Sequence, residues 1–207
     1  MSVAVVTGYV PLPCDHRSAD DYAALGSQLL ALCGKSLAFR QPLADCWMAN
    51  WMADAGMAVE PGGKDTAAYH AVQHEKSRWI ARAAGAMEAE TLVWIDYGLL
   101  HNRKIHPIHV TQLLEAVAAT PPTRIVSPSF GVQSPAPDRI NWTFLGTILV
   151  VPRALAFWFH SNVLDAATNP PTWEVNTWAT VYRQNPDNFF LYGANHDETM
   201  FTRYSSW

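Results

Sequence analysis

The chain has 207 residues, of which 49% are hydrophobic and nine are Trp, and its formal net charge is -4. This composition fits a substantial core, and we expect one domain over residues 1–207. The negative charge disfavours a protein held to nucleic acid by a basic surface. The sequence shows no signal-peptide pattern, no apolar run of membrane-spanning length, and no metal-binding spacing among Cys14, Cys33 and Cys46. We therefore expect a cytoplasmic protein with reduced thiols.

The first quarter of the chain predicts a strand, a helix and a second strand. A short apolar strand is expected over 3–7, followed by a proline-rich loop. Ser18 is a suitable N-cap for the helix, and Gly34 can end it. The second strand is expected over 37–40. The following stretch is rich in Met, Trp and Ala and has no clear assignment.

A longer helix is predicted to begin near residue 65 and to end at 85. Lys76 falls on the apolar stripe of this helix, which should face inward. Either its stem crosses the edge of the core and its ammonium reaches water, or its ammonium points into a cleft. Glu75, Arg78 and Arg82 fall on the other face, where we expect them to be solvated.

The most informative segment is the apolar run over 91–95, which ends in Asp96. A run this short and uniformly apolar is typical of a strand buried on both faces of a parallel sheet. Asp96 then lies at the carboxyl end of that strand, which is the edge where ligands of open α/β sheets bind. A carboxylate there can hold a divalent metal. The alternative is a solvated aspartate that only ends the strand.

Three histidines follow within nine residues. His101, His106 and His109 suggest a metal site, but no Cys or carboxylate accompanies them at a known ligand spacing. The segment also leads into a helix predicted over 107–119. Metal binding by these histidines is therefore the less favoured interpretation.

The remaining elements continue the alternation of strands and helices. Strands are expected over 124–127, 147–151 and 189–192, and helices should begin at Pro152 and after a Thr172 cap. This order predicts an α/β fold with a mainly parallel sheet and helices on both faces. Glycine-rich nucleotide fingerprints and a G-x-S-x-G elbow are absent, which disfavours dehydrogenases, P-loop NTPases and α/β-hydrolases.

Four segments, spread over most of the chain, carry a family resemblance. They are V-V-T-G at 5–8 with Arg17 downstream, the helix with Lys76 before W-I-D-Y-G at 94–98, F-L-G-T at 144–147, and Glu174 followed by Y-R-Q-N-P at 182–186. Their order and spacing resemble a small nucleotide-sugar glycosyltransferase of GT-A type, closest in layout to the bacterial HtrL/YibB-like family. The resemblance implies a single GT-A-like, Rossmann-like domain.

The resemblance implies transfer of a sugar from a nucleotide-sugar donor, such as a UDP-sugar, to a hydroxyl acceptor. The acceptor would be a glycan or a hydroxymethylated base in phage-type DNA. A divalent cation, Mn²⁺ or Mg²⁺, would stabilise the charge on the leaving phosphate. Asp96 and His196 are the expected metal ligands, although His196 is also consistent with a loop histidine bonded to its acidic neighbours. Many GT-A enzymes carry a D-x-D, whereas Gly98 stands in the second place here, which leaves metal dependence open.

The donor is expected at the end of the first strand. Thr7, Gly8 and Tyr9 would lie beside the nucleoside, where Tyr9 either stacks on the base or packs against the protein. Lys76 and Arg17 can pair with the diphosphate directly, and this pairing would matter more without a metal.

An inverting transferase also needs a general base for the acceptor hydroxyl. Glu174 is the first candidate, because it lies in the first turn of its helix and off the core stripe. A carboxylate in that position is also the ordinary partner of the helix dipole. Asp197 and Glu198 are second candidates.

Two other classes of function stay open. Gly98 in place of the second aspartate is consistent with a non-catalytic nucleotide- or sugar-binding domain. The three histidines over 101–109 are consistent with a metal-dependent hydrolase. The transferase hypothesis requires Asp96, Lys76 and His196 to lie near one another.

Overall fold

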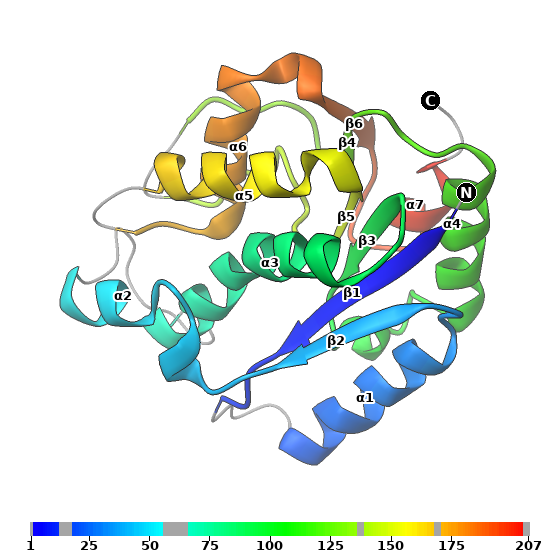
Figure 1. The fold of residues 1–207 in the computed structure, drawn as a ribbon, viewed down its shortest axis with the longest axis horizontal. Coiled ribbons are helices and arrows are strands. Elements are labelled where there is room, and N and C mark those ends of the chain that lie inside the picture. The colour runs from blue at the N-terminus through cyan, green and yellow to red at the C-terminus, as the bar shows by residue number, and fades with distance from the viewer. Residues whose placement is uncertain (1, 13–17, 56–65, 136–138, 168–170, 205–207) are drawn as a thin grey trace.

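The fold is built on one six-stranded sheet with the order β2-β1-β3-β5-β4-β6 (Figure 1). The computed structural model describes residues 2–12, 18–55, 66–135, 139–167 and 171–204. The strands are β1 (Val3–Tyr9), β2 (Ser36–Arg40), β3 (Thr91–Ile95), β4 (Ile125–Ser129), β5 (Ile148–Pro152) and β6 (Phe189–Gly193). β5 pairs antiparallel with both β3 and β4, and the other pairings are parallel. The carboxyl ends of the other five strands therefore meet at one edge of the sheet.

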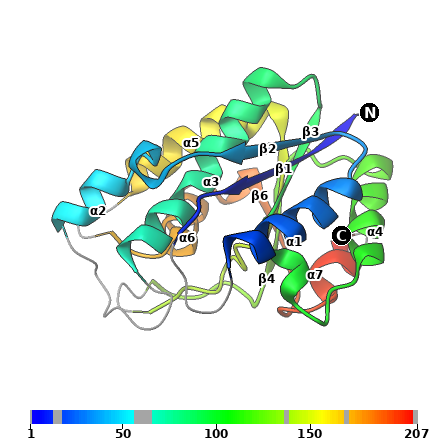
Figure 2. The same ribbon diagram turned by 90° about the horizontal axis from the view of Figure 1, so that it is seen from below.

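Helices cover both faces of this sheet (Figure 2). One core cluster lies beneath α2 (Ala49–Ala55), α3 (Ala67–Ala86), α5 (Arg153–Ala166) and α6 (Glu174–Gln184). A second cluster lies on the opposite face with α1 (Ala19–Ala31), α4 (Pro107–Ala119) and α7 (Thr199–Thr202). Three short 3₁₀ turns, η1 (Leu43–Asp45), η2 (Leu99–His101) and η3 (Pro186–Asn188), connect these elements. Within the described residues, no helix is both long and apolar enough to cross a membrane.

The predicted α/β order is confirmed, with some differences in detail. The sheet is mainly parallel as predicted, and β5 is its antiparallel strand. Ser18 caps α1 as expected, and its hydroxyl accepts from the backbone N–H of Asp21 at 3.1 Å. Thr172 is not a cap, because α6 begins at Glu174 with Trp173 in the N-cap position. The segment left unassigned contains η1 and α2.

The expected solvation of Glu75 is wrong, because its side chain is 0% exposed. The segment between η1 and α2 covers the face of α3 that was expected to be open. The backbone N–H of Trp47 donates to Glu75 Oε2 at 3.0 Å, and Arg78 Nη1 lies 3.2 Å from Oε1. Both partners compensate for the removal of this carboxylate from water.

Glu75 should therefore contribute to stability although it was expected to be solvated. Glu75→Ala leaves the Trp47 N–H without its acceptor and Arg78 without its carboxylate, so we expect a loss of about 2–3 kcal/mol in the free energy of unfolding in urea. The control is Glu115→Ala, which removes an exposed glutamate from α4 and should change stability by less than about 0.5 kcal/mol. Equal effects of the two substitutions would contradict the assigned role of Glu75.

Candidate active site

A buried lysine joins two carboxylates at the carboxyl edge of the sheet. Lys76 Nζ on α3 lies 3.0 Å from Asp96 Oδ1 after β3 and 3.1 Å from Glu174 Oε1 at the start of α6. It also donates to the carbonyl oxygen of Gly146 at 3.0 Å. The Lys76 side chain is 3% exposed, that of Glu174 8%, and that of Asp96 33%. Two expected catalytic residues and one expected diphosphate ligand are thus brought together, and only Asp96 is open to solvent to an appreciable degree.

Local structure explains why these groups converge. Asp96 follows Trp94 by two residues, so both side chains leave β3 on the same side, and Trp94 Nε1 donates to Asp96 Oδ1 at 2.9 Å. Gly146 has φ +72°, in the region that favours glycine. A Cβ at this position would lie only 3.0 Å from Glu174 Oε1. Glycine therefore lets the 144–147 segment approach the two ionised side chains closely.

The electrostatics favour an ionised cluster. Burial alone would lower the pKa of Lys76, but Asp96 and Glu174 outweigh it and raise that pKa above its ordinary value. Burial alone would raise the pKa of Glu174, but Lys76 and then His74 outweigh it and lower that pKa. Glu174 is therefore a carboxylate at neutral pH and can accept a proton. The ammonium has three donors, and each has an acceptor in this structure.

The end of β1 lies beside this cluster but is largely enclosed by protein. The Thr7 side chain is 0% exposed. A Cβ on Gly8 would lie 2.2 Å from the ring of Trp79, so glycine here allows α3 to pack closely on β1. The ring of Tyr9 stacks on those of Tyr22 and Tyr97, with centroids 5.9 Å and 5.2 Å apart. Arg17, the other expected diphosphate ligand, lies outside the described residues.

The His196 ring lies in an aromatic environment. Its ring packs edge-on against Phe130 and Trp142, with centroids 5.5 Å and 5.1 Å apart. Its backbone carbonyl accepts from Asn102 Nδ2 at 3.2 Å. The role of His196 as a metal ligand stays a prediction. Nearby, Asp197 accepts hydrogen bonds from the backbone N–H and hydroxyl of Thr199.

The described residues do not fit a divalent cation held by the protein alone. Among them, no group of three or more His, Cys, Asp or Glu side chains is placed to hold a metal. Asp96 Oδ1 already receives the Lys76 ammonium and the Trp94 indole, and Gly98 supplies no second carboxylate. His101 and His106 are exposed, and the Nδ1 of His109 instead accepts from the backbone N–H of His106.

Sequence reasoning missed several residues that support the cluster. His74, two residues before Lys76 on α3, is 1% exposed, and its Nε2 lies 2.8 Å from the carbonyl oxygen of Thr172. This contact holds the chain two residues before Glu174. The available signal was the unbroken polar run from Gln73 to Arg78, which Val72 and Trp79 flank. The four central residues of this run, His74 to Ser77, are all buried.

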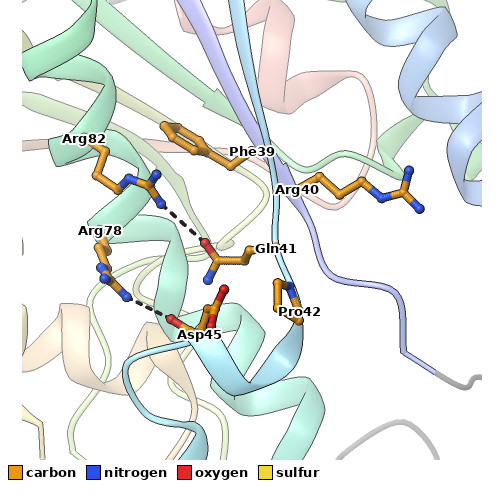
Figure 3. A pocket seen from close by; sticks show the side chains of 7 residues that line it. All are labelled: Phe39, Arg40, Gln41, Pro42, Asp45, Arg78 and Arg82. Atoms are coloured by element: carbon orange, nitrogen blue, oxygen red, sulfur yellow. Dashed lines mark hydrogen bonds between the residues drawn. The ribbon is translucent and has the colours of Figure 1, made fainter.

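A separate pocket of about 630 Å³ opens at the end of β2, between η1 and α3 (Figure 3). None of the site residues expected from the sequence lines it. Its lining consists of Phe39, Arg40, Gln41, Pro42, Asp45, Arg78 and Arg82.

Comparison with solved structures supports the fold. A glycosyltransferase involved in the glycosylation of the major capsid of PBCV-1 is 12% identical, with 93% of this chain and 82% of that chain covered and a TM-score of 0.55. CMP:2-keto-3-deoxy-manno-octonic acid synthetase in complex with CTP is 12% identical, with 94% and 91% covered and a TM-score of 0.49. Glucosyl-3-phosphoglycerate synthase from Mycobacterium tuberculosis in complex with UDP is 10% identical, with 93% and 69% covered and a TM-score of 0.42.

At these identities the first likeness establishes a GT-A-like α/β fold, and the two lower TM-scores add nothing to it. Searches against models of protein families and against curated proteins found no match. The resemblance to the HtrL/YibB-like family is therefore not confirmed.

The close packing of α3 on β1 at Gly8 can be tested by substitution. Gly8→Ala places a methyl group against the Trp79 ring, and we expect the free energy of unfolding to fall by about 1–3 kcal/mol. Gly34→Ala is the matched control, because nothing lies within 4 Å of a Cβ at that position. Urea denaturation measures both variants. A stable Gly8→Ala protein would contradict the close contact of β1 with α3.

His74 should make stability depend on pH. Burial lowers the pKa of His74 to about 4. The hydrogen bond with Thr172 and the charge of Glu174 act to raise this pKa but do not outweigh burial. Below pH 6.5 the unfolded chain takes up a proton at this histidine that the folded chain does not, so stability is lost as the pH falls from 6.5 to about 4. Between pH 7 and pH 4 we expect the wild type to lose about 3 kcal/mol more than His74→Gln, whose amide can still donate to Thr172.

Urea unfolding at a series of pH values measures this difference. His101→Gln, which changes an exposed histidine, should keep the wild-type pH dependence. If His74→Gln keeps it as well, His74 is not buried in its neutral form.

Proposed function

We propose that the chain is a glycosyltransferase that moves a sugar from a nucleotide-sugar donor to a hydroxyl acceptor. The observation that carries this proposal is the pair Asp96 and Glu174, held within 3.1 Å of one buried ammonium at the carboxyl edge of the sheet. Ligands of open α/β sheets bind at that edge. Perturbed ionisable groups at such an edge are typical of functional sites. The likeness in fold to the PBCV-1 capsid glycosyltransferase agrees with this reaction class.

Glu174 is the proposed general base. The acceptor hydroxyl oxygen forms a bond to the anomeric carbon, and the bond from that carbon to the diphosphate breaks with its electron pair on the phosphate oxygen. The hydroxyl proton passes to Glu174, whose lowered pKa keeps it ionised and ready to accept at neutral pH. This direct displacement inverts the anomeric configuration.

The donor is proposed to be a UDP-sugar bound where β1 and β3 end. Its nucleoside would be bordered by the backbone of Thr7 and Gly8 and by the ring of Tyr9. Lys76 can contact the diphosphate only by exchanging one of its present acceptors, Asp96, Glu174 or Gly146. The diphosphate role of Arg17 and the metal roles of Asp96 and His196 stay predictions.

A glycan hydroxyl is the favoured acceptor. A hydroxymethylated base in DNA would bring a phosphate backbone to a chain whose net charge is -4, and protein–DNA affinity depends strongly on basic contacts to that backbone.

A non-catalytic nucleotide-binding domain is the second candidate function. Gly98 in place of a second aspartate supports it. That candidate shares the donor site but needs no base, so Glu174 discriminates between the two.

The test combines nucleotide binding with turnover. A thermal-shift screen of nucleoside diphosphates and UDP-sugars should find one nucleotide that stabilises the wild type, by about 2.7 kcal/mol at a hundred times its Kd. Glu174→Gln should still bind that nucleotide but lose about 10²- to 10⁴-fold in kcat for sugar transfer to a glycan acceptor. Each measurement is made with EDTA and with Mn²⁺, which tests the metal prediction directly.

Glu198→Gln is the control, because Glu198 is exposed and was one of the two second candidates for the base. It should keep the wild-type kcat. Binding without any turnover in the wild type would favour the non-catalytic domain. No response to any nucleotide would overturn both candidates.

A further inference from the structure

The pocket at the end of β2 carries an excess of positive charge. Arg78 and Arg82 line it from α3, and Asp45 is the one acidic lining residue among those that the structure describes. The chain as a whole has a net charge of -4, so this local balance departs from the rest of the protein. We call it the arginine pocket. Figure 3 shows Arg78 and Arg82 side by side on α3, whereas Arg40 points away from them.

Arg82 is the group most available to a ligand in the arginine pocket. The charge of Arg78 is shared with the buried Glu75, whose Oε1 lies 3.2 Å from it. Arg82 is exposed, and within the described residues no carboxylate lies at ion-pair distance from it. Arg82 Nη1 donates a hydrogen bond to the neutral Oε1 of Gln41 at 3.4 Å. That contact uses one of the five N–H donors of the guanidinium.

Arg82 is also held in place before any ligand arrives. Its guanidinium carbon lies 4.7 Å from the centroid of the Phe39 ring. Phe39 stacks on Trp79 with centroids 6.2 Å apart and an interplanar angle of 5°. A guanidinium fixed on an aromatic ring loses less conformational entropy on binding than a free side chain.

The arginine pocket lies on the same sheet edge as the candidate active site. Arg40 pairs in register with Tyr9, and the backbone N–H of Gln41 donates to the Tyr9 carbonyl at 3.4 Å. Trp79 also stacks on Trp94, with centroids 5.7 Å apart. A continuous column of rings therefore runs from the arginine pocket to Trp94, whose indole donates to Asp96.

We propose that the arginine pocket binds a phosphate group of a substrate, with Arg82 as its principal ligand and Arg78 as the second. This inference rests on the proposed transferase function. A fixed guanidinium with free donors is suited to a phosphate, which it can bind in a bidentate manner. The phosphate has two possible sources, the diphosphate of the donor and a phosphorylated acceptor.

The experiment observes the arginine side chains directly. Arginine Nε–Hε resonances of the ¹⁵N-labelled protein are recorded by NMR during titration with inorganic pyrophosphate. The Arg82 and Arg78 resonances should shift with saturation. Arg82→Gln should weaken pyrophosphate binding about tenfold or more. Arg82→Lys keeps the charge but loses the planar fork, and should weaken it by a smaller factor.

Arg103→Gln is the matched control, because it removes an exposed arginine outside the arginine pocket. It should leave pyrophosphate affinity unchanged. The proposal is overturned if Arg82 does not shift with pyrophosphate, or if Arg103→Gln and Arg82→Gln weaken binding equally.

A second titration, with UDP already saturating, separates the two sources. If UDP itself shifts Arg82 and pyrophosphate then adds nothing, the arginine pocket holds the donor diphosphate. If UDP leaves Arg82 unmoved and pyrophosphate still shifts it, the pocket serves a phosphorylated acceptor. Failure of the transferase proposal has a different result. In that case no nucleotide binds, whereas pyrophosphate still shifts the Arg82 resonance.

Discussion

The constraint on which the site depends is the cost of burying the ammonium of Lys76. An unpaired charge with 3% exposure would destabilise the fold by several kcal/mol. Its three acceptors come from three separate segments, the end of β3, the 144–147 segment and the start of α6. The charge is therefore compensated only when these segments are docked on α3. The same contacts that stabilise Lys76 bring Asp96 and Glu174 together.

The neighbours of Lys76 on α3 follow the same rule. Each buried polar side chain of this run bonds to a different covering segment. His74 contacts the residues before α6, Glu75 the segment before α2, and Ser77 contacts His160 of α5 with Oγ and Nδ1 3.0 Å apart. Because α3 is covered on several sides, it has no consistently polar face, and polar side chains fix where its neighbours lie.

The cover on α3 explains which features could be predicted from the sequence and which could not. Period and turn signals are local, so the strand–helix order, the inward position of Lys76 and the place of Asp96 at a strand end could all be predicted. The burial of Glu75 could not, because it depends on Trp47, which is 28 positions away in the chain. The antiparallel direction of β5 and the contact of His74 with Thr172 likewise depend on tertiary packing. The arginine pocket is formed by residues from the end of β2 and from α3 together, so the sequence of neither segment alone predicts it.

The net charge of the candidate active site gives a reason for the arginine pocket on the same edge of the sheet. With Asp96 and Glu174 ionised and Lys76 protonated, the cluster carries a net charge of −1, which repels a diphosphate at short range. A donor with two phosphates therefore needs positive charge from beyond these three residues. Within the described residues, Arg82 lies on the same edge, is held on Phe39, and has no carboxylate partner. The cluster can thus keep an ionised base for the acceptor while the arginine pocket supplies the charge that attracts phosphate.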